Sequence, residues 1–145
     1  MGHYPLRQFV YPVLDFDVYD CDTVKIVSDL GHGLTFNLSV RIMGIDAPEL
    51  RTRNKLEKAA GYLCTAVTCQ WMATLPRCQF HSIKRDKYAG RGIGDFFDLD
   101  KPSDTLSQYL LQLKVVEPYL GGKKKKWSNR RLKDIQKRCK NILGI

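Results

Sequence analysis

Residues 35–49 read Thr35-Phe36-Asn37-Leu38-Ser39-Val40-Arg41-Ile42-Met43-Gly44-Ile45-Asp46-Ala47-Pro48-Glu49. From 35 to 42, polar and apolar residues alternate strictly, which is the period of a strand with one buried face. Arg41 falls on the polar face. Pro48 has no N–H for a ladder and restricts the backbone of the preceding residue, so the strand ends before it. The segment therefore predicts a half-buried strand that presents charged side chains at its end.

The segments on either side of this strand predict the rest of the fold. Residues 8–29 are rich in Val, Ile, Phe and Tyr and suggest two strands joined near Asp20-Cys21-Asp22. Two further strands are expected at 78–84 and 93–99. Five strands with a helix inserted after the third are compatible with an OB-type barrel. We therefore predict an α+β fold, a five-stranded OB-type β-barrel with three α-helices, in a single domain that spans residues 1–145.

The helices are predicted from their caps and their apolar period. Asn54 with Glu57 three residues later resembles a capping box, and apolar residues recur at helical spacing from there until Pro76. Ser103 or Asp104 is expected to cap a short helix that runs to residue 113. Ser128 is expected to cap a last helix, whose apolar stripe consists of Leu132, Ile135, Cys139 and Ile142.

The charge of the chain is concentrated at one end. The formal net charge is +9, and residues 123–145 hold ten Lys or Arg against one Asp, whereas residues 1–122 hold fourteen of each sign. A basic end on a neutral body suits a polyanion such as nucleic acid, through phosphate contacts and counterion release. A solvated basic face is the alternative, and charge alone does not decide between the two.

Cysteine usage and hydropathy predict the setting. The five cysteines show no paired Cys-x-x-Cys spacing, so we expect reduced and mostly buried thiols, with Cys64 and Cys69 in the core. No stretch is apolar over about 18 residues, and the first residues lack the layout of a signal peptide. The expectation is a cytoplasmic protein without a membrane partner, and a monomer.

Several polar residues near strand ends could carry phosphodiester chemistry. Such a reaction needs a base for water and cationic donors for a crowded phosphate. Asp22, Asp46 and Glu49 lie near strand ends, and Arg41 precedes Asp46 by five residues. Oxygen ligands without His or Cys favour a hard cation such as Ca²⁺ or Mg²⁺. Taken singly, each of these residues is explained as well by a turn, a helix start or a solvated strand face.

Read together, three segments resemble a known family. They are Asp20-Cys21-Asp22-Thr23-Val24-Lys25, then residues 41–49, then Asp86-Lys87-Tyr88-Ala89-Gly90-Arg91-Gly92. In order and spacing they are similar to the signature segments of the staphylococcal nuclease (thermonuclease-like) family, over about residues 15–122. The resemblance implies a calcium-dependent nuclease that cleaves DNA and RNA with little sequence preference, with Mg²⁺ as the alternative cation.

The resemblance also implies a role for each matching residue. Asp22 and Asp46 would bind the cation through carboxylates, and Ala47 through its backbone carbonyl. Glu49 would activate water. Arg41 and Arg91 would clamp the phosphate and stabilise the transition state. Lys87 and Tyr88 would hold a flanking phosphate, and Tyr119 would stack on a base or bond to phosphate.

The chain departs from the family pattern at four positions. Cys21 replaces a usual Gly between the two aspartates, and Ala47 replaces Thr. Ala89 lengthens the segment before Arg91 by one residue. Lys114 stands where a Gly is common before the Pro-Tyr segment.

Two other functions remain open at this stage. An OB-type module could bind nucleic acid or a protein without catalysis, although Asp22, Asp46, Glu49, Arg41 and Arg91 are all present. A basic architectural or virion-associated protein would instead depend on residues 123–145. Because a nuclease that is not secreted endangers its host, a phage or mobile-element origin is a further hypothesis.

Overall fold

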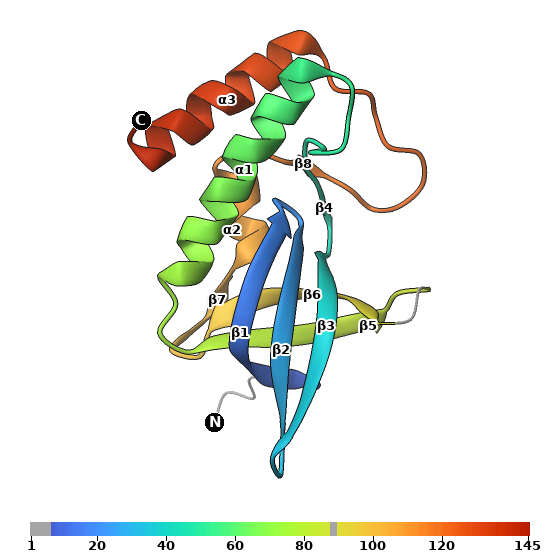
Figure 1. The fold of residues 1–145 in the computed structure, drawn as a ribbon, viewed down its shortest axis with the longest axis vertical. Helices are drawn as coiled ribbons and strands as arrows, with labels where there is room; N and C mark the ends of the chain where they lie inside the picture. The colour runs from blue at the N-terminus through green and yellow to red at the C-terminus, as the bar shows by residue number, and fades with distance from the viewer. Residues whose placement is uncertain (1–6, 88–89) are drawn as a thin grey trace, which may run out of the picture.

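The computed structural model describes residues 7–87 and 90–145 and contains a closed five-stranded β-barrel with three helices, as the sequence predicts. The barrel strands are β1 (Val10–Asp20), β2 (Thr23–Gly31), β3 (Leu34–Ile42), β5 (Cys78–Arg85) and β6 (Arg91–Asp98). Antiparallel pairing links β3, β2, β1, β5 and β6 in that order, and parallel pairing of β3 with β6 closes the barrel. In Figure 1, β5 and β6 cross β1–β3 at a steep angle.

Three short strands were not predicted from the sequence. β7 (Lys101–Thr105) extends the sheet beyond β6, while β4 (Ile45–Asp46) and β8 (Glu117–Pro118) form a separate two-stranded pair. Because residues 103 and 104 belong to β7, they do not cap the next helix. Thr105 does so, since its side chain accepts from the N–H of Gln108, and α2 spans Leu106–Gln112.

Helix α1 (Lys55–Ala73) begins where the sequence predicts, but only half of the capping box forms. The Asn54 side chain accepts hydrogen bonds from the N–H groups of Leu56 and Glu57. The Glu57 carboxylate accepts instead from the N–H of Glu49 at 2.9 Å, and the N–H of Asn54 donates to Thr52 Oγ1. The Glu57 side chain therefore binds the backbone of Glu49 and not the N–H of Asn54, the N-cap residue of α1.

The core fills the barrel and continues beneath α1. Val24, Val40, Ile42, Phe80 and Phe96 are at most 2% exposed. Among the cysteines, the prediction is confirmed for Cys64 and wrong for Cys69, which is exposed. The two lie five residues apart on α1, so at 3.6 residues per turn they point about 140° apart, and one helix face cannot bury both.

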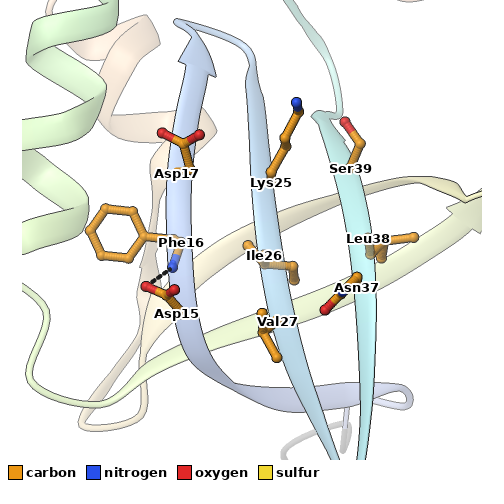
Figure 2. Close-up of a pocket in the computed structure, with 9 residues that line it drawn as sticks. All are labelled: Asp15, Phe16, Asp17, Lys25, Ile26, Val27, Asn37, Leu38 and Ser39. Atoms are coloured by element: carbon orange, nitrogen blue, oxygen red, sulfur yellow. Dashed lines mark hydrogen bonds between the residues drawn. The ribbon is translucent and has the colours of Figure 1, made fainter.

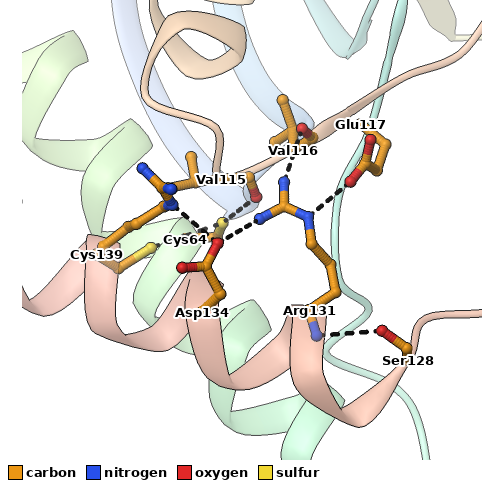
Figure 3. A network of polar contacts seen from close by, with 9 residues as sticks. Cys64, Val115, Val116, Glu117, Ser128, Arg131, Asp134 and Cys139 are labelled. Atoms are coloured by element: carbon orange, nitrogen blue, oxygen red, sulfur yellow. Dashed lines mark hydrogen bonds and ion pairs between the residues drawn. The ribbon is translucent and has the colours of Figure 1, made fainter.

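Helix α3 (Asn129–Leu143), capped by Ser128, is fastened to the chain segment after α2 (Figure 3). The Arg131 guanidinium donates to the Glu117 carboxylate at 2.6 Å, to the Val116 carbonyl at 3.4 Å and to Asp134 at 3.2 Å. The Cys64 thiol donates to the Val115 carbonyl at 3.1 Å. α1 and α3 thus hold residues 115–117 between them and fix β8 against β4. Within the described part of the chain, no helix combines the length and apolarity needed to span a membrane.

The second residue after α2 adopts a strained backbone. Leu113 caps the helix, and Lys114 follows with φ of 58°, in the left-handed region. The Lys114 side chain is exposed, so no packing compensates for the steric cost of a Cβ there. Glycine is the usual residue at this position of a helix C-terminus because it lacks that cost.

Replacing Lys114 with Gly should therefore stabilise the protein. The expected gain in free energy of unfolding is about 1 kcal/mol, the relieved left-handed strain less the greater unfolded-state entropy of Gly. Urea unfolding measures it. Lys125→Gly, at an exposed residue outside the left-handed region, is the control and should give no gain. Equal effects of the two substitutions would contradict the strain at 114.

Candidate active site

Four predicted site residues from distant segments line one cavity of about 430 Å³. They are Asp22 from the turn between β1 and β2, Arg41 near the end of β3, Glu49 from the loop before α1, and Arg91 at the start of β6. The other lining residues are Tyr19, Asp20, Thr23, Lys25, Ser39 and Arg51. The fold therefore brings both predicted arginines and two of the predicted carboxylates together.

The two arginines share a cavity because of how the barrel closes. In the parallel pairing of β3 with β6, Arg91 lies opposite Ser39. Arg41 is two residues further along β3, and residues two apart in a strand point to the same face. Arg91 also forms an ion pair with Asp86 at 3.4 Å.

Arg41 has an unsatisfied buried donor. Its Nη2 is buried and has no hydrogen-bond partner, while its guanidinium lies 5.7 Å from the centroid of the Tyr119 ring. Buried donors nearly always form a hydrogen bond, because a buried donor without a partner costs the full desolvation penalty. An anion with several acceptor oxygens, such as a phosphate, would satisfy it.

Asp22 is a buried carboxyl in an acidic environment. Its backbone carbonyl accepts from the Ile42 N–H at 2.8 Å, which fixes the turn to the end of β3. Burial, and next the neighbouring Asp20 carboxyl, raise the pKa of Asp22 to about 7 against the opposing effects of Arg41 and Lys124. One oxygen of Asp20, Oδ1, is also buried without a hydrogen-bond partner.

Cys21 fits the turn without left-handed strain. It is not among the described non-glycine residues with positive φ, so the family's usual Gly is not required here for its backbone freedom. The Cys21 side chain is fully buried, and the Thr68 hydroxyl of α1 donates to its carbonyl at 2.9 Å. Helix α1 thus anchors the loop that carries Asp20 and Asp22.

The loop that carries Asp46, Ala47 and Glu49 is held equally closely. Asp46 and Ala47 are buried, and Asp46 pairs with Glu117 of β8. The Glu49 side chain is about half exposed. Burial raises the pKa of Glu49. Lys124 lowers this pKa, while Asp22 and Asp46 raise it, so the charges of the three carboxyls affect one another.

The predicted flanking contacts are less closely gathered. Lys87 is exposed and is not among the described residues that line the cavity. Tyr88 lies outside the described residues. Tyr119 lines an adjoining cavity of about 610 Å³ together with Asp46. The Tyr119 N–H donates to the Gly44 carbonyl at 2.8 Å, and its hydroxyl donates to the Gly122 carbonyl at 2.6 Å.

Several lining residues were missed from the sequence. Lys25 and Ser39 line both the candidate site and a shallow groove of about 360 Å³ on the face of β1–β3 shown in Figure 2. Strand period could have identified Ser39, since it shares the face of Arg41. Lys124 places its ammonium 3.1 Å from Asp46 Oδ1 and 3.7 Å from Glu49 Oε1, and no spacing distinguished it from the neighbouring lysines.

The site offers a small set of oxygen donors for a cation. Among the described residues, no three His, Cys, Asp or Glu side chains converge into a metal cage. The carboxylates of Asp22 and Asp46 with the Ala47 carbonyl make a smaller set, of the kind that suits a hard cation retaining several waters. The unpartnered oxygen of Asp20, in the same turn as Asp22, fits this reading because a cation would satisfy it.

Comparison of the chain with protein-family models gave no match, and neither did comparison with curated proteins. The resemblance to the staphylococcal nuclease family therefore rests on the three sequence segments.

The raised pKa of Asp22 predicts how stability depends on pH. Between pH 3.8 and about 7 the folded protein binds a proton at Asp22 that the unfolded chain releases. Stability from this group is therefore full at the acid end and is lost as the pH rises through that window. Asp22→Asn cannot ionise, so in chelator its stability should increase relative to wild type over the same window.

Urea unfolding at a series of pH values in chelator measures this difference. The control is Asp104→Asn, at an exposed carboxyl, whose stability should run parallel to that of the wild type. A relative stability of Asp22→Asn that falls or stays flat with rising pH would contradict a raised pKa.

Gly61 of α1 lies against the loop that carries Glu49. A Cβ on Gly61 would lie 2.9 Å from the Glu49 carbonyl oxygen and 3.0 Å from that of Pro48, so the loop backbone would have to shift. Gly→Ala in a helix normally gains about 0.5–1 kcal/mol. We expect Gly61→Ala instead to destabilise by about 1–3 kcal/mol, as overpacking does. Denaturant unfolding measures the change in free energy of unfolding. A net gain in stability would mean that the loop backbone shifts at little cost.

Proposed function

We propose that the protein is a metal-dependent nuclease that hydrolyses phosphodiester bonds of DNA, and also of RNA, with little sequence preference. The observation that carries this proposal is the cavity in which Arg41 and Arg91 face Asp22 and Glu49. Two guanidinium groups beside carboxylates match the needs of phosphodiester hydrolysis, which are charge stabilisation and a base for water.

Arg41 and Arg91 would bind the phosphate. A planar guanidinium offers paired donors that match two phosphate oxygens, and the buried Nη2 of Arg41 already lacks a partner. Donors fixed before the reaction stabilise the extra negative charge of the pentacoordinate transition state without reorganising. Phosphate contacts carry no base information, which explains the proposed lack of sequence preference.

Glu49 would take the proton from the attacking water. Its side chain is about half exposed, so water reaches it, and its N–H is tied to Glu57 of α1. Burial raises the pKa of Glu49, which makes it a better base than a free carboxylate. When bound, a Ca²⁺ or Mg²⁺ ion held by Asp22, Asp46 and the Ala47 carbonyl would supply charge neutralisation at the phosphate.

The proposal is tested by cleavage of plasmid, single-stranded DNA and RNA in Ca²⁺, Mg²⁺ or chelator. Glu49→Gln should lower the rate by about 100-fold or more, the usual contribution of a general base, while DNA affinity survives. Asp104→Asn is the matched control for loss of a carboxylate at an exposed position and should cleave normally.

Two results would overturn the proposal in different ways. Wild-type protein that binds DNA but leaves it intact in every cation would indicate a binding module without catalysis. Rapid cleavage by Glu49→Gln would leave a nuclease but remove Glu49 as its base.

A further inference from the structure

The Lys124 ammonium lies against two carboxylates of the candidate site. It is 3.1 Å from Asp46 Oδ1 and 3.7 Å from Glu49 Oε1. One side chain of the basic run therefore pairs with two carboxylates of the candidate site.

The other lysines of the run do not share this position. Within residues 7–87 and 90–145, the ion pairs recorded for the run belong to Lys124. Lys123, Lys125 and Lys126 line the adjoining cavity of about 610 Å³ instead. The contact is thus specific to one residue rather than a general effect of basic composition.

An ammonium and a divalent ion cannot occupy this space together. Both would pair with Asp46, which is largely buried, and like charges a few ångströms apart repel each other. With only two buried carboxylates and one carbonyl on offer, the cation is held by few protein ligands. A positive charge that already neutralises Asp46 therefore lowers the affinity of the site for the cation.

The segment that precedes Lys124 is exposed and contains two glycines. Gly121 and Gly122 have φ of 101° and 84°, and Leu120 is 99% exposed. The Tyr119 hydroxyl donates to the Gly122 carbonyl at 2.6 Å, and the Lys124 ammonium lies 5.7 Å from the centroid of the Tyr119 ring. The Lys124 side chain is 37% exposed, so it is not part of the buried core.

We propose that Lys124 determines the affinity of the site for divalent cations: its ammonium is an internal counter-ion of Asp46 and Glu49, and it withdraws when a divalent ion binds. This inference rests on the proposed metal-dependent function. It assigns to one lysine a role that neither the basic composition nor the resemblance provides.

The test measures metal affinity rather than activity. Ca²⁺ is titrated into wild type, Lys124→Ala, Lys124→Arg and Lys125→Ala by calorimetry, with Tb³⁺ luminescence as a second probe. Lys124→Ala should bind about ten-fold more tightly, because the cation no longer displaces a charge from a largely buried carboxylate. Lys124→Arg keeps the charge and should stay near wild type. Lys125→Ala removes an equal charge from the same run and should change affinity much less.

The outcomes separate this inference from the proposed function. If all four proteins bind Ca²⁺ with the same affinity, or if Lys124→Ala binds more weakly than wild type, the role of Lys124 is wrong and the metal site stands. If none binds either ion up to millimolar concentration, the metal site itself fails, and the role of Lys124 fails with it.

Discussion

The parallel pairing of β3 with β6 is the constraint on which the site depends. It closes the barrel and places Arg91, from a segment fifty residues away in sequence, diagonally across from Arg41. The same closure brings the Met43 N–H to the Gly94 carbonyl at 2.9 Å, so the end of β3 is held from both sides. At Gly94 a Cβ would lie 2.1 Å from the His81 carbonyl, which shows how little room the β5–β6 contact leaves.

Helix α1 joins the two acidic loops to this barrel. Thr68 bonds the turn that carries Asp22, Gly61 packs against the carbonyls of residues 48 and 49, and Glu57 accepts from the Glu49 N–H. These contacts lie about one to two turns apart along one helix, so a shift of α1 would move both loops together. The relative positions of the carboxylates are therefore set by one rigid element.

Much of the fold could be predicted because its signals are local. Alternation gave β3, Asn54 and Ser128 gave the starts of α1 and α3, and Pro76 lies just beyond the end of α1. The pairs β4–β8 and β6–β7 were missed because their stability comes from partners distant in sequence rather than from their own period. The four residues of the cavity were predicted through the resemblance of three segments to the staphylococcal nuclease family. Lys124 was not, because one lysine in a run of four carries no local mark of its contact.

The site combines charges that the fold alone does not balance. The carboxyl groups of Asp20 and Asp22 are close together in a buried turn, and the unpaired donor of Arg41 lies beside them. Burying like charges and leaving a donor without a hydrogen bond both cost folding free energy. A sequence selected for stability alone would lack these groups. Their retention is explained if ligands complete them, since a cation favours the carboxylates and a phosphate favours the guanidinium. Under the proposed function, the folding free energy that these groups cost would be recovered when a cation and a phosphate bind.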